Sequence, residues 1–119
     1  MVGGARRDPA ERAARVAQDH ALAERIVAQG VAWFTAWWAE RPVIQSQRQI
    51  AAPVRATMRE RRLANCPVGL AAALRGLGAG ALPPCWDALP DLTLPTLLLT
   101  GAEDAKFTAI ARAMQATLG

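Results

Sequence analysis

The chain has 119 residues, of which 52% are hydrophobic and 20% are charged. This length allows one domain with a core of ordinary size, and the apolar fraction is too high for a disordered chain. The apolar runs fall far short of the roughly 20 residues that a membrane span needs, and no apolar segment follows the N-terminal arginines, so we expect a cytoplasmic protein.

The net charge of +4 is unevenly distributed: residues 1–62 hold 11 Arg against 6 acids, and residues 63–119 hold 3 basic groups against 4 acids. A positive half could attract nucleic acid, an anionic lipid surface or a small polycarboxylate. The arginines are scattered among acids, without a nucleic-acid reading module or a basic tail. We therefore expect no nucleic acid and no membrane as partners, and two readings stay open: a solvated helix face, or selected arginines that bind carboxylates.

Helices are predicted for most of the first 82 residues. Asp8-Pro9 is a helix-start signal, Gly30 a stop, and a second helix runs from residue 31 to residue 40 before Pro42. Residues 43–52 are predicted to be an irregular link. The residues that repeat at helical spacing on the first helix are Ala13, Val16, His20, Ala23 and Val27.

Further along the chain, Pro53 opens a third helix that is rich in arginine and thin in apolar residues. A fourth helix buries Leu70, Leu74 and Leu77, and a glycine series then ends it. A short helical turn carries Trp86.

The segment PTLLLTGAEDAKF predicts a buried strand, a tight acidic turn and a final helix. A strand that is apolar on both faces normally lies inside a parallel sheet, yet no other segment of this chain reads convincingly as a strand. The partner strands must then lie outside this chain, or a second copy supplies them. Self-association through the unpaired strand at residues 94–100 is a further possibility.

Asp104 is the strongest candidate for chemistry, because it follows the predicted strand at the carboxyl end, where open α/β sheets bind ligands. It could orient a histidine, or it could simply cap the final helix, and both readings stay open. Ser46 lacks the flanking glycines of a nucleophile elbow, and His20 has no evident partner. With Cys66 and Cys85 far apart, we expect no metal site and no cofactor.

Four segments together resemble the menaquinone-biosynthesis enzyme 2-succinyl-6-hydroxy-2,4-cyclohexadiene-1-carboxylate synthase, which has an α/β-hydrolase fold. They are PAERAARVAQDHALAERI, WWAERPVIQSQ, RLANCPVGLAAALRGLGAGALPPCWDAL and LLLTGAEDAKFTAIARAM. The resemblance implies an α/β class, represented mostly by a helical lid followed by one parallel-type strand and a helix. It divides the chain into an N-terminal remnant (1–8), the lid (9–82) and a core piece (83–119).

The family is a lyase that eliminates pyruvate from 2-succinyl-5-enolpyruvyl-6-hydroxy-3-cyclohexene-1-carboxylate, with a serine, histidine and aspartate constellation as its base. By resemblance, Asp104 matches the triad acid, Arg15 an arginine that binds a substrate carboxylate, and Trp38 a lid tryptophan that faces the substrate. The elbow serine and the triad histidine are absent, and Ile44 stands where the family tends to carry Phe. We therefore expect a fragment or truncated form, nearly inactive alone.

Two alternatives belong to other functional classes. One is a non-catalytic helical module whose tryptophan and arginine surface binds an anionic ligand or a partner protein. The other is an α/β-hydrolase relative that acts on esters, because fold likeness alone does not fix the substrate.

Overall fold

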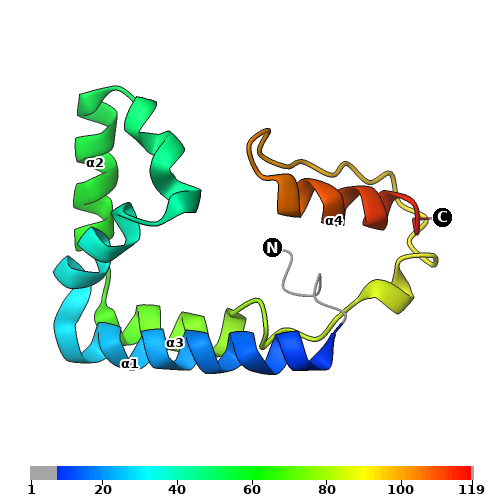
Figure 1. Cartoon of the computed structure of the whole chain (residues 1–119), viewed down its shortest axis with the longest axis horizontal. Helices are drawn as coiled ribbons and strands as arrows, with labels where there is room; N and C mark the ends of the chain where they lie inside the picture. The colour runs from blue at the N-terminus through cyan, green and yellow to red at the C-terminus, as the bar shows by residue number, and fades with distance from the viewer. Residues whose placement is uncertain (1–7, 119) are drawn as a thin grey trace.

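The computed structural model describes residues 8–118, and these residues form six helical segments without a strand. Figure 1 shows α1 and α3 lying side by side, α2 rising from one end of this pair, and α4 on the opposite side of the molecule. Residues 1–7, which belong to the predicted N-terminal remnant, lie outside the described residues. The segments are α1 (Pro9–Ala39), η2 (Pro42–Gln49), α2 (Ala52–Leu63), α3 (Pro67–Leu77), η3 (Trp86–Ala88) and α4 (Ala105–Gln115).

Helix α1 begins where the sequence predicts and is kinked where the sequence predicts an end. The Asp8 carboxylate caps it by accepting a hydrogen bond from the Ala10 amide at 2.9 Å, and Pro9 occupies the first turn. At Gly30 the backbone leaves the helical region, with φ 82° and ψ 173°. The helix is thus two helices joined at a glycine, and the second one turns toward η2 and α2 (Figure 1).

Replacing Gly30 with Ala is expected to lower the free energy of unfolding by about 1–3 kcal/mol. The cost is conformational, because this backbone geometry is essentially restricted to glycine, while a Cβ at Gly30 would meet no atom within 4 Å. Gly76 is the matched control: it lies in α3, also has open space at its Cβ position, and has ordinary helical geometry. Gly76→Ala should stabilise by about 0.5–1 kcal/mol. Urea unfolding measures the free energy of unfolding, which should fall for Gly30→Ala and rise for Gly76→Ala.

Helix α3 packs along α1, and the loop that follows α3 is fastened to the start of α1. Arg12 donates from Nη2 to the carbonyl oxygens of Gly80, at 3.5 Å, and Leu82, at 3.2 Å. A Cβ at Gly80 would lie 2.6 Å from the Arg12 carbonyl oxygen, so this close approach requires glycine. The buried apolar residues of the described part are few, namely Ala23, Ile26, Val31, Ala71 and Trp86.

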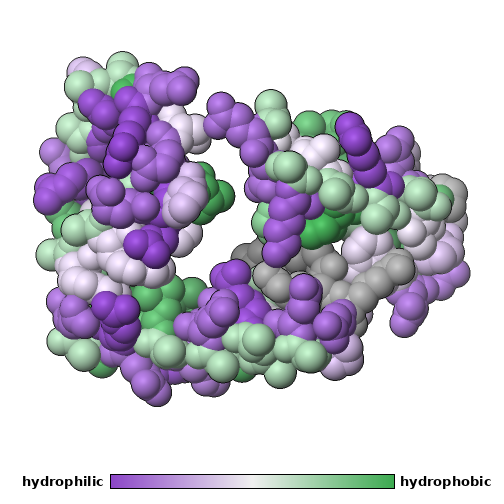
Figure 2. All heavy atoms as spheres, viewed as in Figure 1, coloured by the Kyte–Doolittle hydropathy of each residue, from purple (hydrophilic) through white to green (hydrophobic). Residues whose placement is uncertain are grey.

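The molecule is more open than an independent domain of this size. Its radius of gyration is 16.6 Å, whereas a compact domain of 119 residues has about 13.5 Å. Figure 2 shows a gap between the part built from η2 and α2 and the part built from α4. The described residues therefore enclose only a small core.

The strand predicted for residues 94–100 is not confirmed. This segment runs without regular structure beside α4, as the drawn-out coil in Figure 1 shows. Thr100 and Thr108 share a hydrogen bond between their hydroxyl oxygens at 3.1 Å, which ties the segment to α4. A strand is defined by ladder hydrogen bonds to a neighbouring strand, and residues 8–118 contain no neighbour of that kind.

Other differences concern single elements. The link expected to be irregular forms the 3₁₀ helix η2, which Pro42 opens. His20, expected on the apolar stripe of α1, is exposed.

Candidate functional site

Asp104 holds the junction between the acidic turn and α4. Its amide donates to the Gly101 carbonyl at 3.0 Å, and its Oδ1 accepts from the Phe107 amide at 2.9 Å. The carboxylate therefore caps α4, as one of the two readings of the sequence expected. Its second oxygen, Oδ2, accepts no hydrogen bond from the described residues, so the cap leaves a half-buried acceptor at the turn.

Arg15 lies on the first half of α1, about one turn before Asp19. Its Nε donates to both carboxylate oxygens of Asp19, each at 2.9 Å. The Arg15 side chain is 37% exposed, whereas that of Asp19 is 6% exposed. The guanidinium is thus anchored at Nε, and a little over a third of the side chain remains exposed.

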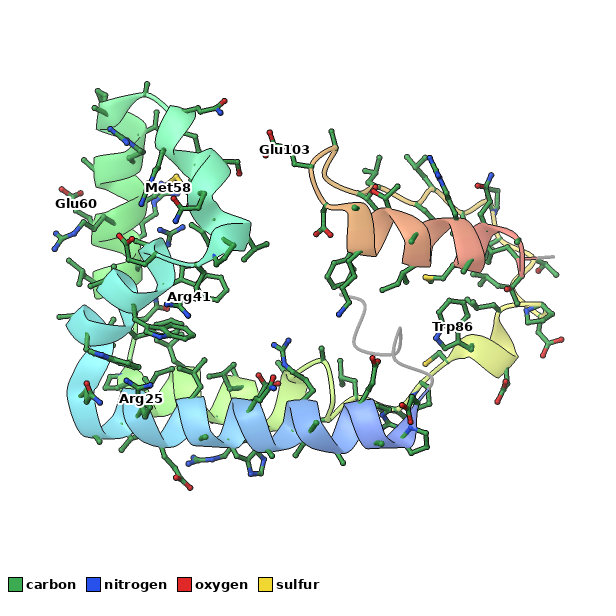
Figure 3. The ribbon with its side chains drawn as sticks, in the orientation of Figure 1. Arg25, Arg41, Met58, Glu60, Trp86 and Glu103 are labelled. Carbon is green, nitrogen blue, oxygen red and sulfur yellow. The ribbon has the colours of Figure 1, made fainter. Side chains whose placement is uncertain are left out.

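Trp38 lies near the end of α1 in a cluster with other aromatic rings. Its ring centroid is 5.9 Å from that of Phe34 and 6.4 Å from that of Trp37. Two arginines cover neighbouring rings: Arg25 lies 4.5 Å above Trp33, and Arg41 lies 4.3 Å above Trp37. Figure 3 shows both arginines beside the bend of α1. Two of the four tryptophan rings thus have a guanidinium group over one face.

A cleft at the end of α1 holds basic groups that the sequence reading did not assign to a site. It has a volume of about 250 Å³ and lies between α1, η2 and α2, where Figure 2 shows hydrophilic atoms gathered and Figure 3 shows Met58 directed from α2 toward η2. Glu40 is its one acidic lining residue. The arginines that line it are Arg48, Arg55, Arg59 and Arg62.

The cleft is partly organised by hydrogen bonds between its own residues. Arg62 donates to Gln47 Oε1 at 2.9 Å, and Arg48 pairs with Glu40 at 3.4 Å. The Thr35 hydroxyl is buried at the cleft and has no hydrogen-bond partner among the described residues. An excess of guanidinium groups around an apolar floor and an unpaired hydroxyl suits an anionic organic ligand.

A second, wider hollow connects η2 with the acidic turn. It measures about 820 Å³ and is lined by residues of η2 and by residues 101–107. Ser46 and Asp104 both line it. Ser46 is exposed in η2 without the strand-to-helix turn of a nucleophile elbow.

The three residues expected at the site occupy three separate places. No hydrogen bond, ion pair or ring contact that the structure records for residues 8–118 joins Arg15, Trp38 and Asp104. Within the same residues no group of His, Cys, Asp and Glu could hold a metal ion. Nor does a helix of this part combine the length and apolar character needed to cross a membrane.

Comparison with known proteins shows which family this chain belongs to. No family model matches the chain. Over 100 residues it is 38% identical to a Bacillus subtilis (strain 168) protein that is provisionally named 2-succinyl-6-hydroxy-2,4-cyclohexadiene-1-carboxylate synthase. The aligned residues make up 84% of this chain and 36% of that protein. The enzyme of that name from Serratia proteamaculans (strain 568) is 31% identical over 105 residues, 88% of this chain and 40% of its own length.

The solved structure of MenH from S. aureus superposes with a TM-score of 0.90 and 32% identity, over 95% of this chain and 42% of that one. This chain thus spans well under half the length of the relatives that it matches. The chain is therefore a homologue of one part of the 2-succinyl-6-hydroxy-2,4-cyclohexadiene-1-carboxylate synthases, and through MenH it is related to the α/β-hydrolase fold.

Proposed function

We propose that this chain supplies the substrate-covering lid and the acid-bearing turn of a menaquinone-pathway synthase, a lyase that eliminates pyruvate from 2-succinyl-5-enolpyruvyl-6-hydroxy-3-cyclohexene-1-carboxylate. The observation that carries the proposal is the superposition of 95% of the chain on MenH with a TM-score of 0.90. In this division of labour residues 9–82 are the lid, and residues 83–119 belong to the hydrolase core.

The charge distribution supports a substrate with several carboxylates. Arg15 offers a guanidinium on α1, and four more arginines line the cleft between α1, η2 and α2. Guanidinium groups bind planar carboxylates through paired hydrogen bonds. These hydrogen bonds become stronger where water is excluded. Trp38 would supply an apolar surface for the cyclohexene ring.

Asp104 would orient and stabilise a histidine that acts as the base. That histidine and the elbow serine are expected from polypeptide outside residues 8–118, since His20 and Ser46 are exposed on α1 and η2. Oδ1 is used for capping α4, and Oδ2 is left for an imidazole N–H. The Asp104 carboxylate could thus cap α4 and orient a histidine at the same time.

A hybrid enzyme tests the proposal. Residues 8–118 replace the matching segment of the Serratia proteamaculans relative, and pyruvate release is compared with hydrolysis of a simple ester. We expect pyruvate release within about 100-fold of the parent and little esterase activity, while the 119-residue chain alone should be nearly inactive. A folded hybrid that hydrolyses esters but releases no pyruvate would favour the esterase alternative.

A second candidate function rests on the arginine-lined cleft, because its lining residues all belong to the described part of the chain. A non-catalytic module could bind an anionic ligand there without any triad. Tight binding of a dicarboxylate by the chain, together with an inactive and well-folded hybrid, would support this reading over the synthase.

A further inference from the structure

We propose that Asp19 is the positioning residue that fixes the orientation of Arg15 for carboxylate binding, and that Gly78 is required to keep Asp19 in place. This inference rests on the proposed role of Arg15 in substrate binding. It assigns a function to a buried acid that the triad chemistry does not use.

The geometry fixes one end of the guanidinium and leaves the other end available. Both Asp19 oxygens accept from Arg15 Nε at 2.9 Å. No hydrogen bond from Arg15 Nη1 or Nη2 to another described residue accompanies this contact. An arginine held at Nε has lost most of its rotamer freedom, so the entropy cost of presenting its two Nη groups to a ligand is already met.

The position of Asp19 is in turn determined by the loop after α3. Asp19 is 4% exposed, although it is charged. A Cβ at Gly78 would lie 2.5 Å from Asp19 Oδ2 and would also collide with the Leu74 carbonyl. The absence of a side chain at Gly78 therefore allows the carboxylate to sit between α1 and the loop. Arg12, about two turns before Asp19 on α1, holds the same loop through the Gly80 and Leu82 carbonyls.

Positioning and simple charge predict opposite effects for the loss of this carboxylate. The negative charge of Asp19 repels an anionic ligand at Arg15, so its removal by itself would tighten binding. If Asp19 instead orients Arg15, its removal weakens binding. The sign of the change thus separates a positioning residue from a bystander.

The experiment uses the 119-residue chain and the probe 2-succinylbenzoate, an aromatic dicarboxylate with the succinyl and ring carboxyl groups present in the relatives' name. Titration calorimetry gives the dissociation constant, and the Nε–Hε signal of Arg15 in ¹⁵N–¹H NMR spectra reports the contact with Asp19. Asp19→Asn keeps the side-chain volume and is expected to weaken binding about tenfold, the size of effect typical for a hydrogen bond to a charged group. The Nε–Hε signal should shift and exchange faster with water.

Two further variants control for charge and folding. Gly78→Ala changes no charge but displaces Asp19, so it should weaken binding by a similar factor, whereas Gly76→Ala, which meets no atom within 4 Å, should not. Glu24→Gln removes one exposed carboxylate from the same helix and should leave binding unchanged or slightly tighter.

The outcomes distinguish this inference from the proposed function. If the chain binds the probe and Asp19→Asn binds it equally well or more tightly, the positioning role is overturned while the synthase proposal stands. If Arg15→Ala binds as well as the wild type, or the wild type does not bind the probe, the substrate role of Arg15 fails and the positioning role fails with it. Weaker binding by both Asp19→Asn and Gly78→Ala, with Gly76→Ala unchanged, supports the inference.

Discussion

Asp104→Asn is expected to lower pyruvate release by the hybrid enzyme about 10³–10⁴-fold, with little change in folding stability. In a serine–histidine–aspartate constellation, exchanging the acid for its amide leaves the histidine in the wrong tautomer and removes the charge that stabilises the imidazolium. Asn is nearly as good a helix cap as Asp. The hydrogen bond from the Phe107 amide to the side-chain oxygen, 2.9 Å long in the wild type, should therefore survive.

Two variants separate catalysis from capping. Asp104→Ala removes the cap as well as the acid, so it should lose the same activity and, in addition, about 1 kcal/mol of unfolding free energy. Glu103→Gln is the matched control, because it removes a neighbouring carboxylate that is exposed at the same turn and extends toward η2 and α2, as Figure 3 shows. It should leave activity and stability unchanged. Steady-state pyruvate assays and urea unfolding of the three variants provide both readouts.

One result would contradict the catalytic role of Asp104. If Asp104→Asn keeps full activity while Asp104→Ala loses only stability, the carboxylate is a helix cap and nothing more. The acid of the triad would then have to come from another segment of the assembled enzyme.

The helices could be predicted from the sequence because their start and stop signals are local. Asp8-Pro9 caps α1, Gly30 breaks it, and Pro53 lies in the first turn of α2, and each acts through its own backbone preferences. The strand at residues 94–100 could not be confirmed because strand formation depends on non-local pairing. Whether residues 94–100 form a strand depends on a partner that the described part of the chain does not contain.

Burial on α1 was harder to predict than the helix itself. The apolar spacing placed His20 and Val27 on the buried stripe, yet His20 is exposed and Val27 is 50% exposed. The buried face instead includes Ile26 and the charged Asp19, which is acceptable there because Arg15 pairs with it. Periodicity defines a stripe, but only α3 and its loop decide which side of the helix is covered.

The arginine-lined cleft was missed because its residues come from three elements. In the sequence, Arg55, Arg59 and Arg62 belong to one predicted helix, and two readings of the arginines stay open: a solvated helix face, or selected arginines that bind carboxylates. The kink at Gly30 and the 3₁₀ helix η2 bring Thr35 and Arg48 to the same cleft. The available signal was the thin apolar face of α2, which indicated that its arginines face something other than a core.

Leu97→Lys combined with Leu99→Lys is expected to abolish association through residues 94–100 without unfolding the rest of the chain. These leucines are 79% and 84% exposed, whereas Leu98 between them is half-buried, and Leu97 and Leu98 both line a hollow beside α4. The segment thus lies against a helix and still exposes two leucine side chains, as a strand of a layered sheet would without its other layer. We propose that it pairs with β-structure from outside residues 8–118, supplied by the rest of the synthase or by a second copy of this chain.

The magnitude follows from the apolar surface. Burying a leucine side chain contributes about 1.5–3 kcal/mol, so two leucines contribute about 3–6 kcal/mol, or roughly 10²–10⁴ in an association constant. Sedimentation velocity over a range of concentrations measures self-association, and amide exchange of residues 96–100 measures pairing. Wild-type amides should exchange rapidly when the chain is dilute and slowly when it is paired.

Val68→Lys is the matched control, because Val68 is 64% exposed on the helix α3 and not on the extended segment. It should leave association unchanged, since a helix offers no extended edge for a ladder of hydrogen bonds. Pairing by the double-lysine variant equal to that of the wild type would mean that the backbone edge alone drives association. Fast amide exchange at residues 96–100 under every condition, including in the active hybrid, would remove the case for a strand altogether, because a paired strand protects its amides.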